Sequence, residues 1–225
     1  MSVIYHNDIL QGTDEWLALR RGVITASEMS LLITPTGKTA DNEKSRAHVW
    51  ELLAQRLSGR TEPQYISDDM LRGEEDETAA RDLYSEHYAP VDQCGFITRA
   101  VGGAIVGYSP DGLVGLDGLI EIKSRRQRFQ FETIASGTVP LEYMWQIQTG
   151  LFVTGRAWCD FVSYSNGLPM LTIRVEPDAN AQERIAEVVA ETEARIAALR
   201  AICDAAAHSR RLIQTVWQER MEILV

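Results

Sequence analysis

Two carboxylates and a lysine stand close together in the stretch 108–128, YSPDGLVGLDGLIEIKSRRQR. Its part 120–123 alternates apolar and charged residues, which predicts a strand that projects Glu121 and Lys123 from one face. Asp111 comes from a Pro-Asp-Gly turn before that strand, and we expect it on the neighbouring strand of a hairpin. Two carboxylates and a lysine that converge in this way suit a hard divalent cation and an attacking water.

Each of these signals has a simpler interpretation when taken alone. An aspartate in a Pro-Asp-Gly turn commonly hydrogen-bonds its own backbone. A Glu-x-Lys pair is also common on the solvated face of an antiparallel strand. The elements around the stretch therefore have to decide between a hydrolytic centre and an ordinary hairpin.

The N-terminal region predicts a place for a phosphate. Thr13 can cap a helix that ends near Arg20 and Gly22, and the next helix begins with a capping box at 25–28, TASE. Arg20 then precedes a helix N-terminus whose free N–H groups and hydroxyls, from Thr25 and Ser27, suit an anion. The alternative is a pair of ordinary caps beside a solvated arginine.

A second carboxylate-bearing element is the helix expected from a cap at Ser67 to about Tyr84. It contains Gly73, and a glycine inside a helix suggests that another backbone packs closely there. Glu77 lies four residues later, on the same face, and we expect it to point toward whatever passes that glycine. The other acids of the run, 74–76, are expected on a solvated face.

The remaining patterns predict a single α/β domain over residues 1–225, with a core at 14–175 and C-terminal helices at 178–222. We expect a short irregular start and, after a helix at 42–57, a change to the two-residue period of strands. The expected strands are 94–100, 104–108, 120–123, 158–164 and 170–175; the expected helices are 127–135, 141–153 and, with a break near 208–209, 178–222.

Composition excludes several classes of protein. Hydrophobic residues make up 45% and charged residues 24% of the 225, as in ordinary globular proteins. No apolar run approaches the roughly 20 residues that span a bilayer, and the N-terminus lacks a secretory pattern, so we expect a cytoplasmic protein without membrane contact. Three scattered cysteines predict neither disulfides nor a zinc site. Any metal should therefore have oxygen ligands, which favours Mg²⁺ or Mn²⁺.

The net charge of -10 argues at first against a nucleic-acid partner. Carboxylates that bind a metal are offset by the ion, however, and acids can be segregated from a local basic groove. The acids gather at 68–77 and in the C-terminal helices, whereas arginines gather at 20–21 and 125–128. Lysine accounts for only three of the 22 basic residues, yet one of the three is Lys123 beside Glu121.

Taken together, Pro110-Asp111, Glu121 and Lys123 resemble the signature of the PD-(D/E)XK nuclease superfamily. The resemblance extends to the phage lambda exonuclease family, also called YqaJ-type viral recombinases or alkaline exonucleases. Its pieces occur in the family's order over 16–148: WLALRRGVITASE from Trp16, Gly73-x-x-x-Glu77, SPDGL from Ser109, IEIK from Ile120 and QIQ from Gln146. One departure is Ser124-Arg125, where family members often have a proline soon after the lysine.

The resemblance implies a fold and a role for each matching residue. The fold would be restriction-endonuclease-like, a central mixed β-sheet flanked by helices. Asp111 and Glu121 would bind one or two Mg²⁺ ions, with Mn²⁺ as a substitute, and Glu77 would complete the cluster. The remaining roles would be the carbonyl of Ile122 as a metal ligand, Lys123 on the attacking water, Gln148 supporting the lysine or the scissile phosphate, and Arg20 and Ser27 on a terminal 5′-phosphate.

Arginines 125, 126 and 128 follow the strand and are expected to track the DNA backbone. A lysine near metal ions can have its pKa lowered by positive neighbours and by desolvation, which would let Lys123 exchange a proton.

The function implied is a metal-dependent exonuclease on linear double-stranded DNA that works 5′ to 3′ and leaves 3′ single-stranded tails. A homotrimeric ring around the duplex and a single-strand annealing protein that receives the tail are implied as partners, in the cytoplasm of a bacterial host. Two alternatives stay open. One is a restriction-like or repair endonuclease with the same core, and the other is a catalytically silent DNA-binding or assembly protein.

Overall fold

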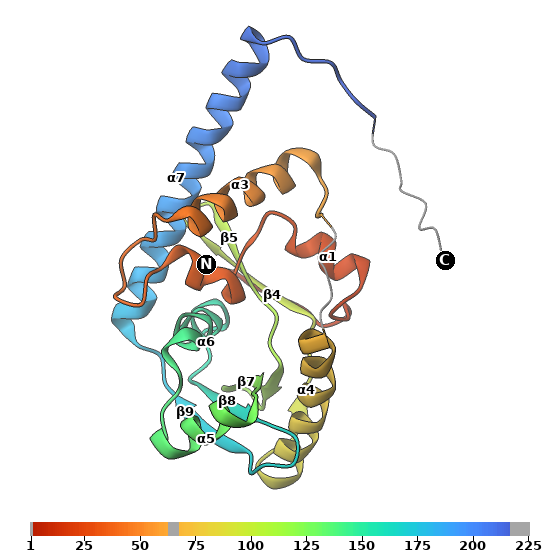
Figure 1. Cartoon of the computed structure of the whole chain (residues 1–225), viewed down its shortest axis with the longest axis vertical. Coiled ribbons are helices and arrows are strands. Elements are labelled where there is room, and N and C mark those ends of the chain that lie inside the picture. Colours follow the sequence, from red (N-terminus) through yellow and green to blue (C-terminus); the bar gives the residue numbers. More distant parts are fainter. Residues whose placement is uncertain (1, 63–67, 217–225) are drawn as a thin grey trace.

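The computed structural model describes residues 2–62 and 68–216. Figure 1 shows a body of helices and strands from which the last helix projects, with residues 210–216 outside that body. The sequence predicts one central mixed sheet, but the strands form two sheets, each of them mixed. The fold is a mixed α/β arrangement, as expected.

The first sheet has the order β1-β4-β5-β2. It consists of β1 (Val3–His6), β2 (Ile24–Thr25), β4 (Phe96–Val101) and β5 (Ala104–Tyr108). The predicted hairpin of β4 and β5 is confirmed, whereas the N-terminal segment that was expected to be irregular forms β1 and pairs with β4.

The second sheet has the order β3-β6-β7-β8-β9 and carries the residues of the IEIK motif. It consists of β3 (Val91–Asp92), β6 (Gly112–Val114), β7 (Gly118–Ser124), β8 (Trp158–Tyr164) and β9 (Leu171–Val175). The hairpins β6–β7 and β8–β9 are those predicted, and a parallel pairing of β7 with β8 joins them.

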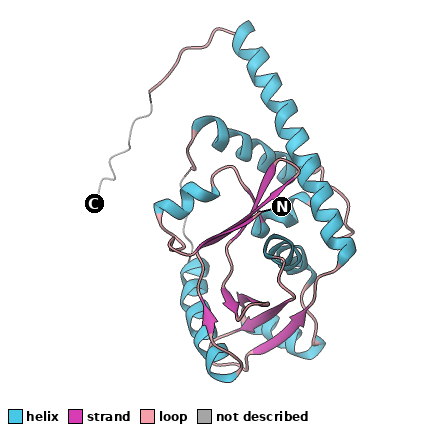
Figure 2. Ribbon diagram, turned by 180° about the vertical axis from the view of Figure 1, so that it is seen from behind, coloured by secondary structure: helices cyan, strands magenta, loops and turns pink. Residues whose placement is uncertain are grey.

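The helices cover both sheets, as the view from behind also shows (Figure 2). Side-chain caps from Thr13, Asn42 and Asp178 begin three of them, because each accepts a hydrogen bond from a first-turn backbone N–H. The helices are α1 (Asp14–Arg20), a 3₁₀ turn (Ala26–Glu28) that leads into α2 (Met29–Leu32), α3 (Glu43–Ser58), α4 (Asp68–His87), α5 (Gln127–Ser136), α6 (Leu141–Thr154) and α7 (Ala179–Ser209). The predicted cap Ser67 lies outside the described residues.

Two apolar clusters position the second sheet. In the smaller one, Ala80 and Tyr84 of α4 pack with Ile120 and Ile122 on one side of β7. These isoleucines alternate with Glu121 and Lys123, so the predicted separation of an apolar and a charged face is confirmed. The larger cluster joins α2, α3, α6 and α7 to the first sheet and to the far end of β7.

Two expectations about the helices are wrong. A Cβ added at Gly73 would meet no atom within 4 Å among the described residues, so no backbone packs closely against that glycine. The C-terminal helix ends at Ser209, and 210–216 have no regular structure instead of continuing as a helix. Leu212, Ile213 and Val216 are exposed there, so no apolar surface supports a further helix. The rest of the predicted helix, 217–222, lies outside the described residues.

Within the part of the chain that the structure describes, none of the helices combines the length and the apolar character needed to cross a bilayer.

Candidate active site

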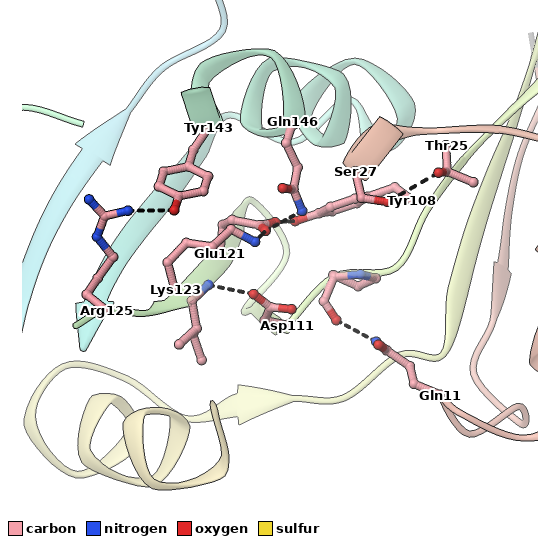
Figure 3. A network of polar contacts seen from close by, with 12 residues as sticks. Gln11, Thr25, Ser27, Tyr108, Asp111, Glu121, Lys123, Arg125, Tyr143 and Gln146 are labelled. Carbon is pink, nitrogen blue, oxygen red and sulfur yellow. Dashed lines mark hydrogen bonds and ion pairs between the residues drawn. The ribbon is translucent and has the colours of Figure 1, made fainter. Parts of the chain in front are cut away.

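The β6–β7 hairpin brings Asp111 next to the centre of β7. Gly112 pairs with Ile120, so the residue before β6 lies opposite the IEIK segment. The backbone N–H of Ile122 donates a hydrogen bond to Oδ2 of Asp111 over 2.5 Å. Lys123 Nζ lies 2.7 Å from Oε1 of Glu121 on the same face (Figure 3). The predicted convergence of two carboxylates and a lysine is therefore present.

Glu121 is fully buried, and neighbouring side chains hold both of its oxygens. The hydroxyl of Tyr108 donates to Oε2 over 2.9 Å, and Nε2 of Gln146 donates to Oε1. The backbone of Gly150 in α6 packs closely against the ring of Tyr108, since a Cβ added at this glycine would lie 2.8 Å from the ring. Strands β5 and β7 and helix α6 thus hold one carboxylate in a single orientation.

Burial and mutual repulsion shape the electrostatics of the site. Burial, followed by the negative charge of Glu121, raises the pKa of Asp111 well above its usual range. Burial also favours the neutral form of Lys123, but the charges of Glu121 and Asp111 outweigh it and raise the pKa of the amine. In the metal-free protein the two carboxylates therefore favour the ammonium form of Lys123, and the lowered pKa expected near bound metal ions stays a prediction.

Glu77 reaches the edge of this cluster. Its carboxylate pairs with Arg81 one turn later in α4, and Nε of Arg81 also donates to the carbonyl of Asp111 over 2.8 Å. Burial raises the pKa of Glu77, with a further contribution from Glu121. The third predicted carboxylate is thus close enough to Glu121 to interact electrostatically, and Arg81 ties it to the Asp111 turn.

The predicted role of Gln148 does not fit its position. Its amide is buried and spans the β9–α7 connection, donating to the carbonyl of Glu176 and accepting from the N–H of Asp178, both over 2.9 Å. Gln146 reaches Glu121 instead. Helix residues two apart differ by about 200° around the axis, so only one of these glutamines can face the site. The spacing within QIQ shows that they diverge but not which one faces inward.

The predicted phosphate-binding residues gather around Arg20. Its guanidinium donates to Ser109 Oγ over 3.1 Å and to Ser27 Oγ over 3.5 Å, and it stacks on Trp16 at 4.4 Å. Burial lowers the pKa of Arg20, while the charge of Glu28 acts against that shift. A partly desolvated guanidinium with two hydroxyls around it suits an anion such as phosphate.

The predicted capping box at 25–28 does not form as expected. Thr25 Oγ1 donates to the carboxylate of Glu28 over 2.5 Å and makes no cap bond to a backbone N–H. The segment is one 3₁₀ turn followed by a four-residue helix, and neither start has a side-chain cap bond. The hydroxyls of Thr25 and Ser27 therefore contact other side chains. The hydroxyl oxygens of Thr25 and Ser27 lie 3.3 Å apart (Figure 3). Ser27 also accepts a hydrogen bond from Arg20.

The three arginines after Lys123 differ from one another. Arg126 and Arg128 are exposed, as a DNA-tracking role requires, and Arg128 pairs with Glu132 over 3.5 Å. Arg125 is buried, and its guanidinium donates to the hydroxyl of Tyr143 over 2.5 Å. Arg125 therefore does not share the exposed surface of Arg126 and Arg128, and its predicted contact with the DNA backbone stays a prediction.

Besides Tyr108, Arg81 and Gln146, three further residues near the site were missed by the sequence reasoning. Ser109 joins Arg20 to the Asp111 turn. Gln11 Nε2 donates to the carbonyl of Pro110 over 2.8 Å and so supports the same turn (Figure 3). Asp76, expected on a solvated face, is buried and accepts a hydrogen bond from Ser124 over 2.5 Å. Its position one residue before Glu77 was the only sequence signal for it.

The oxygen donors fit a hard divalent cation, which the fold family implies. The half-buried carboxylate of Asp111 and the buried one of Glu121 repel each other, and a cation between them would relieve that repulsion. Among residues 2–62 and 68–216, no three His, Cys, Asp or Glu side chains lie close enough together to hold an ion. The carbonyl of Ile122 and water would have to complete such a site, with Glu77 at its edge.

Comparison with solved structures defines the class of protein. An alkaline exonuclease, LHK-Exo from Laribacter hongkongensis, is 36% identical and matches with a TM-score of 0.73, covering 88% of this chain and 100% of that one. LHK-Exo in complex with dAMP matches at 34% identity and a TM-score of 0.70, with the same coverage. A phage related exonuclease from Haemophilus somnus, 13% identical with a TM-score of 0.58 over 80% and 96% of the two chains, shares the fold alone. The fold is of the PD-(D/E)XK exonuclease type.

The family is shown by the sequence itself. Residues 15–157 match the YqaJ-like viral recombinase domain, and this chain belongs to that family. No curated protein matches the sequence. The resemblance found in the motifs is thereby confirmed, and family and neighbours together support an exonuclease.

Proposed function

We propose that this protein is a metal-dependent exonuclease that digests one strand of linear double-stranded DNA from its 5′ end. The observation that carries the proposal is the link between two sites. Asp111, Glu121 and Lys123 form a hydrolytic cluster, and Ser109, two residues before Asp111, bonds to Arg20. An anion grip thus lies beside a cleavage centre, as removal of nucleotides from a phosphorylated end requires.

The carboxylates of Asp111 and Glu121, with the carbonyl of Ile122, would hold one or two Mg²⁺ ions, or Mn²⁺ in their place. When bound, such ions lower the pKa of water and neutralise charge on the phosphoryl oxygens. Lys123, held beside Glu121, would orient the attacking water and stabilise the phosphate's growing negative charge. Gln146 and Tyr108 hold Glu121 in place through its two oxygens.

Direction follows from the Arg20 grip. A terminal 5′-phosphate bound by Arg20, Ser27 and Ser109 places the first internucleotide linkage near Asp111. Hydrolysis that leaves the phosphate on the shortened strand creates a new 5′-phosphate, which can enter the same grip. Digestion would thus repeat along one strand and leave a 3′ single-stranded tail.

Two partners belong to this proposal. A single-strand annealing protein would receive the tail in phage-type recombination. A homotrimeric ring would encircle the duplex, which answers how a chain of net charge -10 stays on DNA. Light scattering at working concentration tests the ring, and a monomer would count against it.

The test of the main proposal uses two substrates of one sequence. Linear duplex with 5′-phosphates and closed circular duplex are incubated with the protein and Mg²⁺, and then with Lys123→Ala. We expect loss of the linear substrate alone, release of mononucleotides, and no loss with Lys123→Ala. Cutting of the circle would indicate an endonuclease, and no Mg²⁺-dependent loss of either substrate would indicate a catalytically silent protein.

A further inference from the structure

A pocket of about 360 Å³ lies where β7 passes into α5, just beyond the lysine of the cleavage centre. Its walls come from three places: Arg72 and Asp76 of α4, the segment 125–127, and the turn 165–166 between β8 and β9. None of these residues belongs to the cluster of Asp111, Glu121 and Lys123 or to the Arg20 grip. The pocket is therefore a separate site beside the active site.

The charge of the pocket is positive. Arg72, Arg125 and Arg126 line it together with the carboxylate of Asp76, and Glu142 pairs with Arg125 from outside the lining. That carboxylate already accepts a hydrogen bond from Ser124 over 2.5 Å and lies 3.9 Å from Arg72. Three guanidinium groups around one satisfied carboxylate favour an anionic ligand.

A buried donor in the pocket points the same way. The side chain of Arg125 is only 8% exposed, and its Nη1 donates to Tyr143 over 2.5 Å and to Glu142 over 3.0 Å. Its Nε, by contrast, has no hydrogen-bond partner within the described part of the chain. A buried N–H without an acceptor is costly, and a shift of the guanidinium toward a ligand oxygen in the pocket would supply one.

The ten-residue helix α5 also presents its N-terminus to this pocket. Arg126 is the N-cap and makes no side-chain cap bond, and Gln127, the first helical residue, lines the pocket. The first N–H groups of a helix point out of its N-terminus and together favour a phosphate. The free helix end and the buried Nε of Arg125 are independent observations, and both call for an anion.

The position of the pocket selects the anion. Lys123 and Arg125 both lie against Tyr143, with Nζ and Cζ at 5.5 Å and 5.2 Å from its ring centre. Figure 3 shows Glu121 and Lys123 between Arg125 on one side and Thr25 and Ser27 on the other. If Arg20 and Ser27 hold the 5′ end and Lys123 faces the scissile phosphate, the next phosphate of that strand lies toward Arg125.

We propose that this pocket binds the phosphate directly 3′ of the scissile one in the strand being digested, the second internucleotide linkage from the 5′ end. The inference rests on the proposed exonuclease function. The pocket would fix the strand on the far side of the cleaved bond, as the Arg20 grip does on the near side.

The test pairs a protein charge with a DNA charge. Duplexes with a 5′-phosphate carry one uncharged methylphosphonate linkage, moved along either strand, and binding is measured by fluorescence anisotropy without divalent ions. Arg126→Gln removes one pocket charge from an exposed position, and Arg72→Gln is a second variant on α4. Arg200→Gln is the matched control, because Arg200 is 61% exposed on the distant helix α7.

We expect the neutral second linkage to weaken binding about tenfold for the unmodified protein and for Arg200→Gln. Arg126→Gln and Arg72→Gln should bind the unmodified duplex more weakly. Their affinity should not fall further when the second linkage is made neutral. Equal losses in all proteins would overturn the proposal, as would coupling at a linkage of the complementary strand. Inorganic phosphate could instead stabilise the protein, with both pocket variants abolishing this effect and no linkage showing coupling. That result would identify a free-phosphate site and would also overturn the proposal.

Digestion of linear duplex by the unmodified protein is followed in parallel. Digestion without coupling removes the pocket proposal and leaves the exonuclease proposal intact. Coupling without digestion removes the exonuclease proposal and leaves the pocket as a binding site for a DNA phosphate.

Discussion

Arg20 donates a hydrogen bond of 3.1 Å to Ser109, although 89 positions separate them in the chain. Ser109 stands two residues before Asp111, in a turn that Trp16 and Gln11 also hold, over 2.9 Å and 2.8 Å. The proposed anion grip and the carboxylate of Asp111, a proposed metal ligand, are therefore held by one supported turn. In the proposed reaction, the fold would set the distance from a bound 5′ end to the cleaved bond.

Arg20→Ala is expected to abolish the preference for phosphorylated ends. The ratio of digestion rates on 5′-phosphate and 5′-hydroxyl duplexes should fall toward one, because a charge-assisted contact is lost from one substrate only. Ser109→Ala should lower the ratio less, since Ser27 still bonds to Arg20. A ratio that stays at the value of the unmodified protein in both variants would show that the end is bound elsewhere.

Gln146→Ala and Gln148→Ala should separate activity from stability. Loss of Gln146 removes one of the two side-chain donors to Oε1 of Glu121 and leaves only Lys123 there, so we expect an about tenfold lower rate with an unchanged unfolding midpoint. Loss of Gln148 leaves the N–H of Asp178 and the carbonyl of Glu176 without their hydrogen-bond partner. This should cost about 2 kcal/mol of unfolding free energy. Urea denaturation and digestion rates, measured on both variants, would refute the assignment if the two effects were exchanged.

Mg²⁺ should stabilise the protein more strongly as pH rises. Burial and the charge of Glu121 raise the pKa of Asp111 above its unfolded value, so the metal-free protein gains stability from this proton at low pH. That contribution is lost as pH rises through the raised pKa, and a metal ion then replaces the proton. The Tm increase caused by Mg²⁺ should grow with pH, and Asp111→Asn should remove this growth. A shift that is constant across the same pH range would contradict the site.

Gly73→Ala should stabilise the protein by about 0.5–1 kcal/mol. The glycine lies inside α4, and an added Cβ meets no described atom within 4 Å. Gly150→Ala is the opposite case, since its Cβ would lie 2.8 Å from the Tyr108 ring that supports Glu121. We expect that variant to unfold at lower denaturant and to digest DNA more slowly. Destabilisation by Gly73→Ala would show that another surface covers α4.

The sequence by itself determined the features that depend on local periodicity. Glu121 and Lys123 share a face because side chains alternate along a strand. The hairpin that presents Asp111 to them was also predicted, and its turn is 115–117 because Gly118 already belongs to β7. The cap at Thr13 follows from local side-chain chemistry. The ordered motifs, spread over more than half of the chain, were enough to identify the family.

Only the tertiary structure decided which of several equivalent local candidates enters the site. Gln146 faces Glu121 and Gln148 does not, because the packing of α6 sets its rotation about its own axis. Arg125 is buried while Arg126 is exposed, and Asp76 is buried in a run that looks uniformly acidic. Burial depends on which elements, distant in the sequence, pack over a residue. The hydrophobic period of a single segment cannot predict those contacts.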